Sequence, residues 1–468
     1  MKALFKLQCL GALTLNTSRL ILVRICALTL CGLMCSCFLG SAVAGMPIQH
    51  WSLGTGAQVY LITTPNLPML DVQVDFDAGS RRDRADLTGV SSAVAMMVSK
   101  GVKESLGRPA LDENQLGEAW ADLGASFMAS SSQDRFSFRL RTLTEPALLG
   151  AAIELAAQQM SSPSFDAKIF IRERDKALAG LKESLTQPGT VAGRAFAKAL
   201  YPDHPYGALV TPESLLATQI GDVQDFYKNY ITPCSARISM VGNVSRERAT
   251  QIAESLMAQF PKQKGCASLP PITGVKDLQT PSEQRITFDS AQAHVLIGAP
   301  AIERADPDYF PLTVGNYVLG GGGFVSRLTE QVREKRGLSY SVYSYFAPAK
   351  QAGPFTIGLQ TRPDQALQAV TLSRQIVAEF VKNGPTPAEL KAAKDNLIGG
   401  FPLRLDSNKK LLDNLANIAW NDLPLNYLDT WVSEVQRVSI QDIRTAFKKH
   451  VHPDAMATVI VGGKYETR

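Results

Sequence analysis

DVQDFYKNY at residues 222–230 and DIRTAFKKH at residues 442–450 are two copies of one pattern, and they decide the fold of this 468-residue chain. Each copy leads through a proline into a short apolar strand that ends at a glycine. The Asp, Pro and Gly match at an offset of 220 residues, which also superposes Arg84-Ala85-Asp86 on Arg304-Ala305-Asp306. The sequence therefore predicts two homologous halves that use one supersecondary unit twice.

Strand patterns come early in the first half and helical patterns follow them. Apolar and polar residues alternate over residues 70–77 and 136–141, with the period of half-buried antiparallel strands. Long helical runs occupy residues 145–160, 166–185, 190–200, 364–382 and 386–398. Because strands and helices do not alternate strictly, the pattern favours an α+β fold. We expect each half to be a mainly antiparallel sheet with helices packed on it.

The chain is too long for one compact core, so we expect more than one domain. Periodicity is lost between Pro261 and Pro281, where a Lys-Gln-Lys-Gly run and a Pro-Pro pair mark a boundary. The predicted organisation is a signal peptide at residues 1–44, an N-terminal half at 45–261, a linker at 262–283 and a C-terminal half at 284–468.

The N-terminus has the features of an export signal. Residues 25–44 are largely apolar, follow two separated basic residues and end in Ala-Val-Ala before Gly45, which is a small-x-small cleavage pattern. We predict a cleaved signal and a periplasmic location. The alternative is an uncleaved anchor facing the periplasm, because about 20 apolar residues can span a bilayer. Contact with a membrane is expected only in that case.

The net charge of +5 belongs mostly to this segment. Residues 1–44 contain no acid and four basic residues (Lys2, Lys6, Arg19 and Arg24), and without them 44 basic side chains face 43 acidic ones. A nearly neutral mature chain argues against a broad surface that follows phosphates. We therefore expect no nucleic-acid partner.

Two cysteines remain in the predicted mature chain, Cys234 and Cys266, because the other five lie in the N-terminal segment. Their wide separation suits neither a C-x-x-C zinc knuckle nor a redox motif. Two interpretations stay open: a disulfide formed in an oxidising compartment, or two unrelated buried thiols.

Residues 319–345, LGGGGFVSRLTEQVREKRGLSYSVYSY, place a glycine run, a basic helix and a tyrosine-rich strand in direct succession. We expect the helix over residues 326–336, a stop at Gly337 and a strand from Tyr340 onward. This segment resembles the glycine-rich segment of the insulinase/pitrilysin zinc peptidases, in the branch that includes mitochondrial processing peptidase. The resemblance covers essentially the whole mature chain and implies two homologous peptidase-like halves that close like a clamshell over a peptide.

The resemblance also implies roles for particular residues. Arg333 and Tyr340 have the spacing of a pair that, in the family, binds the substrate backbone and the oxygen that becomes anionic during hydrolysis. Guanidinium and phenol both donate hydrogen bonds, which suits this task. Without the resemblance, Arg333 would be read as a solvated arginine paired with Glu330, and Tyr340 as a half-buried strand residue. The glycine run would be a flexible wall of the chamber, which makes these residues candidates for substrate binding: Gly320, Gly321, Gly322, Gly323 and Phe324.

The zinc motif of that family, His-x-x-Glu-His, occurs nowhere in the chain. Aligning Thr88-Gly89 with the family pattern places Ser92 and Met96 on the two histidines and Ala95 on the glutamate. A hydroxyl and a thioether are poor zinc ligands, and a methyl group cannot take a proton. The segment still predicts a packing helix, because four apolar residues share one face: Val90, Val94, Met97 and Val98.

The family's third ligand aligns loosely with residues 179–180, and Glu173 and Glu183 are possible replacements. One carboxylate without two histidines makes no tight zinc site. We interpret His204 as part of a structural turn and His450-x-His452 as a surface pair.

These observations predict the inactive partner-subunit type of the family. The chain is expected to hold no cofactor and to be inactive by itself, while a homologous subunit brings the zinc. This chain would close the peptide chamber and supply Arg333 and Tyr340 across the interface. The alternative is a homodimeric peptide-binding or structural protein without a proteolytic role. No nucleophile elbow or Cys/His arrangement supports an unrelated enzyme.

Overall fold

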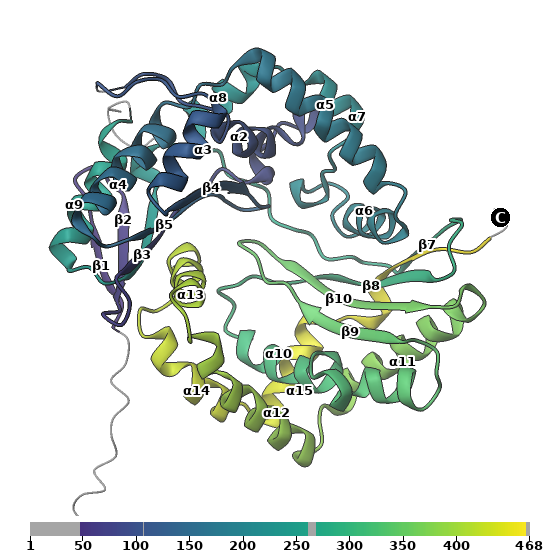
Figure 1. The fold of residues 1–468 in the computed structure, drawn as a ribbon. Helices are drawn as coiled ribbons and strands as arrows, with labels where there is room; N and C mark the ends of the chain where they lie inside the picture. The colour runs from purple at the N-terminus through teal and green to yellow at the C-terminus, as the bar shows by residue number, and fades with distance from the viewer. Residues whose placement is uncertain (1–46, 106, 261–267, 465–468) are drawn as a thin grey trace, which may run out of the picture. The chain divides into compact units, whose positions relative to one another are not determined.

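The computed structural model describes residues 47–105, 107–260 and 268–464 (Figure 1). The residues from 47 onward belong to one structural unit, residues 46–468. The predicted signal peptide lies outside the described residues, as does Cys266. Cys234 is disulfide-bonded, so the interpretation as an unrelated free thiol is wrong for this residue. Within the described part, no helix has the length and apolar character needed to cross a bilayer.

The first half is built on a six-stranded mixed sheet with the order β1-β2-β6-β3-β5-β4. Strands β2 and β6 are parallel, and the other neighbouring pairs are antiparallel. The predicted alternation falls on β3 and β5, which pair from Met69 opposite Leu143 to Phe76 opposite Phe136. The strands are β1 (Gln49–Ser52), β2 (Gln58–Thr63), β3 (Met69–Phe76), β4 (Ser126–Ser131), β5 (Phe136–Leu143) and β6 (Arg237–Gly242).

Helices of the first half include the three long runs expected from the sequence, which are α4, α5 and α6. α4 and α9 pack against each other, and α2 packs against α8. The helices are α2 (Val90–Val98), α3 (Glu113–Asp122), α4 (Pro146–Ser161), α5 (Ala167–Ser184), α6 (Pro188–Leu200), α7 (Pro212–Ala217), α8 (Ile220–Tyr230) and α9 (Arg246–Ala258).

The second half has a five-stranded sheet with the order β7-β11-β8-β10-β9, in which only the pair of β7 and β11 is parallel. Its strands are β7 (Ser282–Ile286), β8 (Ala293–Ile302), β9 (Ser341–Phe346), β10 (Gly353–Thr361) and β11 (Ala457–Val461). Its helices are α10 (Tyr309–Asn316), α11 (Ala366–Asn383), α12 (Pro387–Gly400), α13 (Asn408–Trp420), α14 (Tyr427–Arg437) and α15 (Ile440–His450).

The 220-residue offset holds for the equivalent helices and for β6 and β11, whereas other strands are shifted by a few residues. α6 and α13 coincide residue for residue at this offset, as do α8 and α15, which carry the two copies of the sequence pattern. The strand order β2-β6-β3-β5-β4 in the first sheet matches β7-β11-β8-β10-β9 in the second. The predicted α+β fold with two homologous halves is confirmed. Among the described residues, β1, α3 and α9 have no counterpart in the second half.

Two helices are exchanged between the halves. α6 of the first half packs on β8 and β11 of the second sheet, and α13 of the second half packs on β2, β3 and β6 of the first sheet. Phe196 and Leu200 of α6 share a buried cluster with Val459 and Val461 of β11. Each half therefore contributes a helix to the other half's sheet, an arrangement that the repeat in the sequence did not predict.

Candidate functional site

Helix α2 is the segment that the sequence aligns with the lost zinc motif. Its predicted packing face is confirmed, since four apolar residues are buried: Val90, Val94, Met97 and Val98. The Asp83 carboxylate accepts hydrogen bonds from the N–H groups of Gly89 and Ser91, at 2.8 and 3.1 Å. Burial outweighs these bonds and raises the pKa of Asp83 to about 6. The helix keeps its packing and its N-terminal cap although the zinc-binding side chains are gone.

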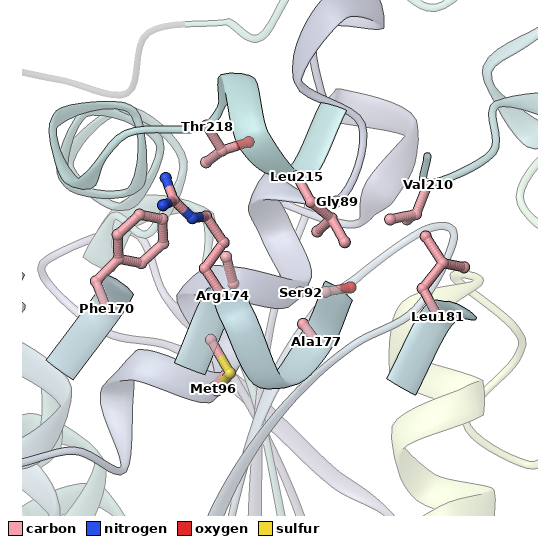
Figure 2. Close-up of a pocket in the computed structure, with 11 residues that line it drawn as sticks. Gly89, Ser92, Met96, Phe170, Arg174, Ala177, Leu181, Val210, Leu215 and Thr218 are labelled. Carbon is pink, nitrogen blue, oxygen red and sulfur yellow. The ribbon is translucent and has the colours of Figure 1, made fainter. Parts of the chain in front are cut away.

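Ser92 and Met96 lie on one face of α2 and line an apolar pocket of about 200 Å³ (Figure 2). The facing residues of α5 include Phe170 and Arg174. Ala95, at the position of the family's glutamate, does not line this pocket. The face that would carry zinc offers no imidazole and no carboxylate from α2, so these residues do not fit a zinc ion.

Glu173, one of the two possible replacement ligands, is buried on α5. Its carboxylate lies 2.7 Å from Arg172, 2.9 Å from Lys176 and 3.7 Å from Lys100. Burial favours the neutral acid, but these cations outweigh it, so the pKa of Glu173 is lowered. This carboxylate is the centre of a structural ion-pair network. Glu183, the other candidate, is exposed to solvent.

The second half has a groove of about 580 Å³ beside the glycine run. Six of the seven residues predicted there line it, and Gly322 does not. Those six are Gly320, Gly321, Gly323, Phe324, Arg333 and Tyr340. The floor and far wall come from Asn316, Thr329 and residues 341–345 of β9.

Arg333 and Tyr340 converge in this groove. The guanidinium carbon of Arg333 lies 4.9 Å from the centre of the Tyr340 ring and 4.6 Å from the centre of the Phe324 ring. Contacts of a cation with two aromatic rings restrain its position. Glu334 lies 3.2 Å from Arg333 Nε, whereas Glu330, the partner expected for an ordinary surface arginine, pairs with Lys335. Tyr340 is 80% exposed, so its phenol is accessible from the groove.

The helix expected over residues 326–336 is shorter and wider than predicted. It begins at Arg327, and Thr329–Glu334 has π-helical hydrogen bonding. Wide turns of this kind occur often at functional sites. Gly337, with φ of +61°, ends the helix as expected, and Tyr340 immediately precedes β9.

The glycine run is packed closely against β9. A Cβ on Gly320 would lie 2.4 Å from Ser344 Oγ and 2.6 Å from Ser344 N. The Asn316 side chain fixes the same contact, since it donates to the Ser344 carbonyl at 3.0 Å and accepts from the Ser344 hydroxyl at 2.7 Å. Close packing, more than backbone freedom, requires glycine at this position. Asn316 also lines the groove, and the sequence interpretation missed it. Its position four residues before Gly320, about one helical turn away, could have indicated that both residues face the same side.

Strand β9 is an edge of the second sheet, because it pairs only with β10 within the described residues. Tyr343 and Tyr345 project from it, 43% and 42% exposed, with their rings stacked at 6.0 Å. An edge strand presents backbone N–H and C=O groups that can pair with an extended peptide. On the side of β9 away from β10, however, the carbonyls of Val342 and Ser344 already accept hydrogen bonds from Thr329 and Asn316. The groove therefore combines an arginine, an accessible phenol and an edge strand that is partly covered by the glycine run.

Two of the histidines, His204 and His450, have structural partners. His204 accepts a hydrogen bond from the Tyr206 N–H at 3.1 Å and contacts Gln351 at 2.7 Å, which agrees with its interpretation as part of a turn. The interpretation of His450 as a surface residue is wrong: its side chain is 8% exposed and lies 2.9 Å from Asp308. Packing of α15 against α10 explains this burial, which a helix end in the sequence did not reveal.

One group in the described part of the chain has the spacing of a metal site. Asp306, Asp308 and His450 bring their ligand atoms within 4.8 Å of one another. The ammonium of Lys449 lies 2.7 Å from Asp308 and 3.8 Å from Asp306. A side-chain cation thus already pairs with these carboxylates, and the cluster is accounted for by the packing of α15.

Comparison with known proteins agrees with this architecture. The model of the insulinase family (peptidase family M16) matches residues 58–212, and that of the peptidase M16 inactive domain matches residues 219–397. The crystal structure of a peptidase M16 inactive domain from Pseudomonas fluorescens is 32% identical, with a TM-score of 0.84 over 90% of this chain and 99% of that chain. The chain belongs to the peptidase M16 (insulinase) family. The family predicted from the sequence is confirmed.

Relatives within the M16 family carry two kinds of name. A Bacillus subtilis protein named uncharacterized zinc protease YmxG is 26% identical, over 85% of this chain and 94% of its own length. A Helicobacter pylori protein named non-peptidase homolog YmxG is 27% identical, over 85% of this chain and 90% of its own. The periplasmic protease PqqL of Escherichia coli has the same fold, with a TM-score of 0.74, 16% identity and coverage of 89% of this chain and 46% of PqqL.

Proposed function

We propose that this chain is the non-catalytic subunit of a heterodimeric M16 zinc metallopeptidase. It closes the peptide chamber of a zinc-bearing homologous partner and supplies Arg333 and Tyr340 to that partner's active site. One observation carries the proposal: the arginine and the accessible phenol converge in a groove, while α2 has Ser92 and Met96 where zinc ligands would stand. We propose that zinc belongs to the partner and that this chain holds no cofactor.

The two side chains suit the stabilisation of a developing oxyanion. Peptide hydrolysis places negative charge on the carbonyl oxygen, and Arg333 and Tyr340 both carry donors for it. Donors that are already oriented are worth about 10²–10³ in rate. The Phe324 and Tyr340 rings on the Arg333 cation provide this orientation. The exposed rings of Tyr343 and Tyr345 on β9 support a further role, in which they pack against a bound peptide beside Arg333.

The test is co-expression with a related subunit that has a complete His-x-x-Glu-His motif. We expect Arg333→Ala or Tyr340→Phe to lower peptide turnover by about 10²–10³ for the arginine and by less for the phenol, with assembly intact. Arg336→Ala is the matched control, since Arg336 lies on the same segment and bonds Gln331 away from Tyr340. Wild-type turnover in both Arg333→Ala and Tyr340→Phe would contradict the proposal.

The purified chain provides a second test. By itself it is expected to bind no stoichiometric zinc and to cleave no peptide, because the α2 face lacks zinc ligands. Metal analysis and a peptide assay with and without EDTA measure both properties. EDTA-sensitive cleavage by the isolated chain would refute the role of a non-catalytic subunit.

A homodimeric peptide-binding or structural protein is the second candidate. It is favoured by the Helicobacter pylori relative that is named a non-peptidase homolog. Sedimentation of the chain alone and mixed with the zinc-bearing subunit separates the two candidates. A stable homodimer that does not bind the zinc-bearing subunit would support this alternative.

We also propose that the protein works in the periplasm. The apolar residues 25–44 with their small-x-small ending support export. Fractionation of cells expressing the full chain, with mass measurement of the mature N-terminus, tests both export and cleavage after residue 44.

A further inference from the structure

The pocket on α2 has a chemical character of its own, which does not depend on the proposed partner. It opens among α2, α5 and the segment around α7. Its lining is mainly apolar, with one arginine and two hydroxyl groups. The lining residues are Gly89, Ser92, Ala93, Met96, Phe170, Arg174, Ala177, Leu181, Val210, Leu215 and Thr218 (Figure 2).

Arg174 is the one charged residue in this lining, and its hydrogen-bonding capacity is largely unused. Its Nε is buried without a hydrogen-bond partner among the described residues. The nearest carboxylate recorded is that of Asp175, 3.9 Å away on a side chain that is 64% exposed. The guanidinium also lies 5.9 Å from the centre of the Phe170 ring. A guanidinium has five N–H donors, so most of them remain available to a ligand.

The second half shows that the fold does not require this opening. At the 220-residue offset, larger buried residues replace smaller or more open ones: Leu312 for Ser92, Leu397 for Ala177 and Phe401 for Leu181. These three belong to one buried cluster. Lys394 stands at the position of Arg174 and donates to the Gln436 carbonyl at 2.7 Å. In the second half, the equivalent contact is therefore filled with apolar side chains and its cation is hydrogen-bonded. In the first half, the pocket is open and the Arg174 Nε has no hydrogen-bond partner among the described residues.

We propose that this pocket binds a small free monocarboxylate with an apolar body, its carboxylate on Arg174. A cavity of about 150 Å³ holds a benzene molecule, so a pocket of about 200 Å³ suits an aryl ring with a short tail or a chain of about six to ten carbons. The apolar body displaces water from the surfaces of Met96, Phe170 and Leu181. The carboxylate takes charge-assisted hydrogen bonds from the guanidinium, which is suited to planar two-point pairing.

The apolar wall favours a free acid over the C-terminal residue of a peptide. A peptide terminus would bring an amide N–H and a carbonyl close to its carboxylate. Thr218 is the hydroxyl on the α7 side, and it already donates to the Ser214 carbonyl at 2.8 Å. Buried amide groups without partners are costly, so a peptide terminus is the poorer fit.

The experiment is calorimetric titration of the mature chain with 3-phenylpropionate, and with 3-phenylpropanol as its neutral analogue. We expect the acid to bind with a Kd of about 1 mM or tighter, and the alcohol about tenfold more weakly. Arg174→Gln should weaken the acid about tenfold and leave the alcohol nearly unchanged. Ala177→Leu, which copies Leu397 of the second half, should abolish binding of both.

Two controls keep the result interpretable. Arg248→Gln removes an exposed arginine on α9 that bonds Gln251 and should leave both affinities unchanged. Ser92→Leu, which copies Leu312, replaces Ala177→Leu if that variant fails to fold by circular dichroism. If 3-phenylpropionate does not bind to the wild type, the proposal is overturned. It is also overturned if Arg174→Gln and a folded pocket-filling variant both bind 3-phenylpropionate as tightly as the wild type does. Tighter binding of Gly-Gly-Phe than of 3-phenylpropionate would overturn the assignment to a free acid.

Discussion

The two halves share their strand order and six of their helices but differ in what the equivalent helices α2 and α10 do. α2 has lost its zinc ligands and retains a buried face, whereas α10 is followed by the glycine run and its Asn316 holds β9 in place. Asn316 stands at the repeat position of Met96. In each helix, the buried apolar face is separate from the residues at the zinc-ligand positions of α2 and from Asn316 of α10. Because core packing uses one face and ligands use another, this fold can lose a metal site and keep its shape.

Gly315 of α10 and Ala95 of α2 occupy the same repeat position and give the largest expected difference between the halves. A Cβ on Gly315 would lie 2.4 Å from the Phe447 ring and 2.8 Å from Ile443. Gly315→Ala should therefore lower the free energy of unfolding by about 2–3 kcal/mol, because overpacking outweighs the gain in helix propensity. Ala95→Gly should cost about 1 kcal/mol or less. Urea titration of both variants measures the change in the free energy of unfolding. If Gly315→Ala is more stable than the wild type, α15 must be able to move away from the added methyl group.

Much of this architecture could be predicted from the sequence. The period of the β3 and β5 residues and the repeated helix pattern at α8 and α15 indicated the fold. The prediction that β3 is half-buried is wrong, because its polar residues Asp71, Gln73 and Asp75 are also buried, on a sheet that α13 covers. The spacing of Arg333 and Tyr340 placed both in one groove. The exchange of α6 and α13, the role of Asn316 and the burial of His450 could not be predicted. These depend on contacts between segments far apart in the chain, which local patterns do not encode.

Asp83 and Glu303 also share a repeat position, but Asp83 is half-buried and bonds to the N-terminus of α2, whereas Glu303 is exposed. The folded-state pKa of Asp83 is raised from 3.8 to about 6. Its stabilising contribution is therefore full below pH 3.8 and is lost as the pH rises through 6. Between pH 4 and pH 7, the free energy of unfolding of the wild type should fall by about 2 kcal/mol relative to that of Asp83→Asn. In this variant an amide oxygen still accepts the hydrogen bonds from Gly89 and Ser91.

Urea unfolding at several pH values between 4 and 7 measures this difference. Glu303→Gln is the matched control at the same repeat position and should follow the wild type at every pH, since this side chain is exposed to solvent. Parallel curves for the wild type and Asp83→Asn would mean that the half-buried Asp83 carboxyl titrates as it does in the unfolded chain.

The smallest effect is expected where the halves are alike. The first residue of each repeated stretch, Asp222 or Asp442, accepts a hydrogen bond at 2.8 Å from the N–H of the helix N-cap residue, Gln219 or Ser439. Asp222→Ala and Asp442→Ala should each cost about 1 kcal/mol, because each removes one capping bond and one negative charge near a helix N-terminus. The midpoints of thermal unfolding measure the pair. Equal shifts would show that capping explains why this aspartate recurs in both copies, whereas a shift in only one half would mean that the repeated residue has acquired a second task there.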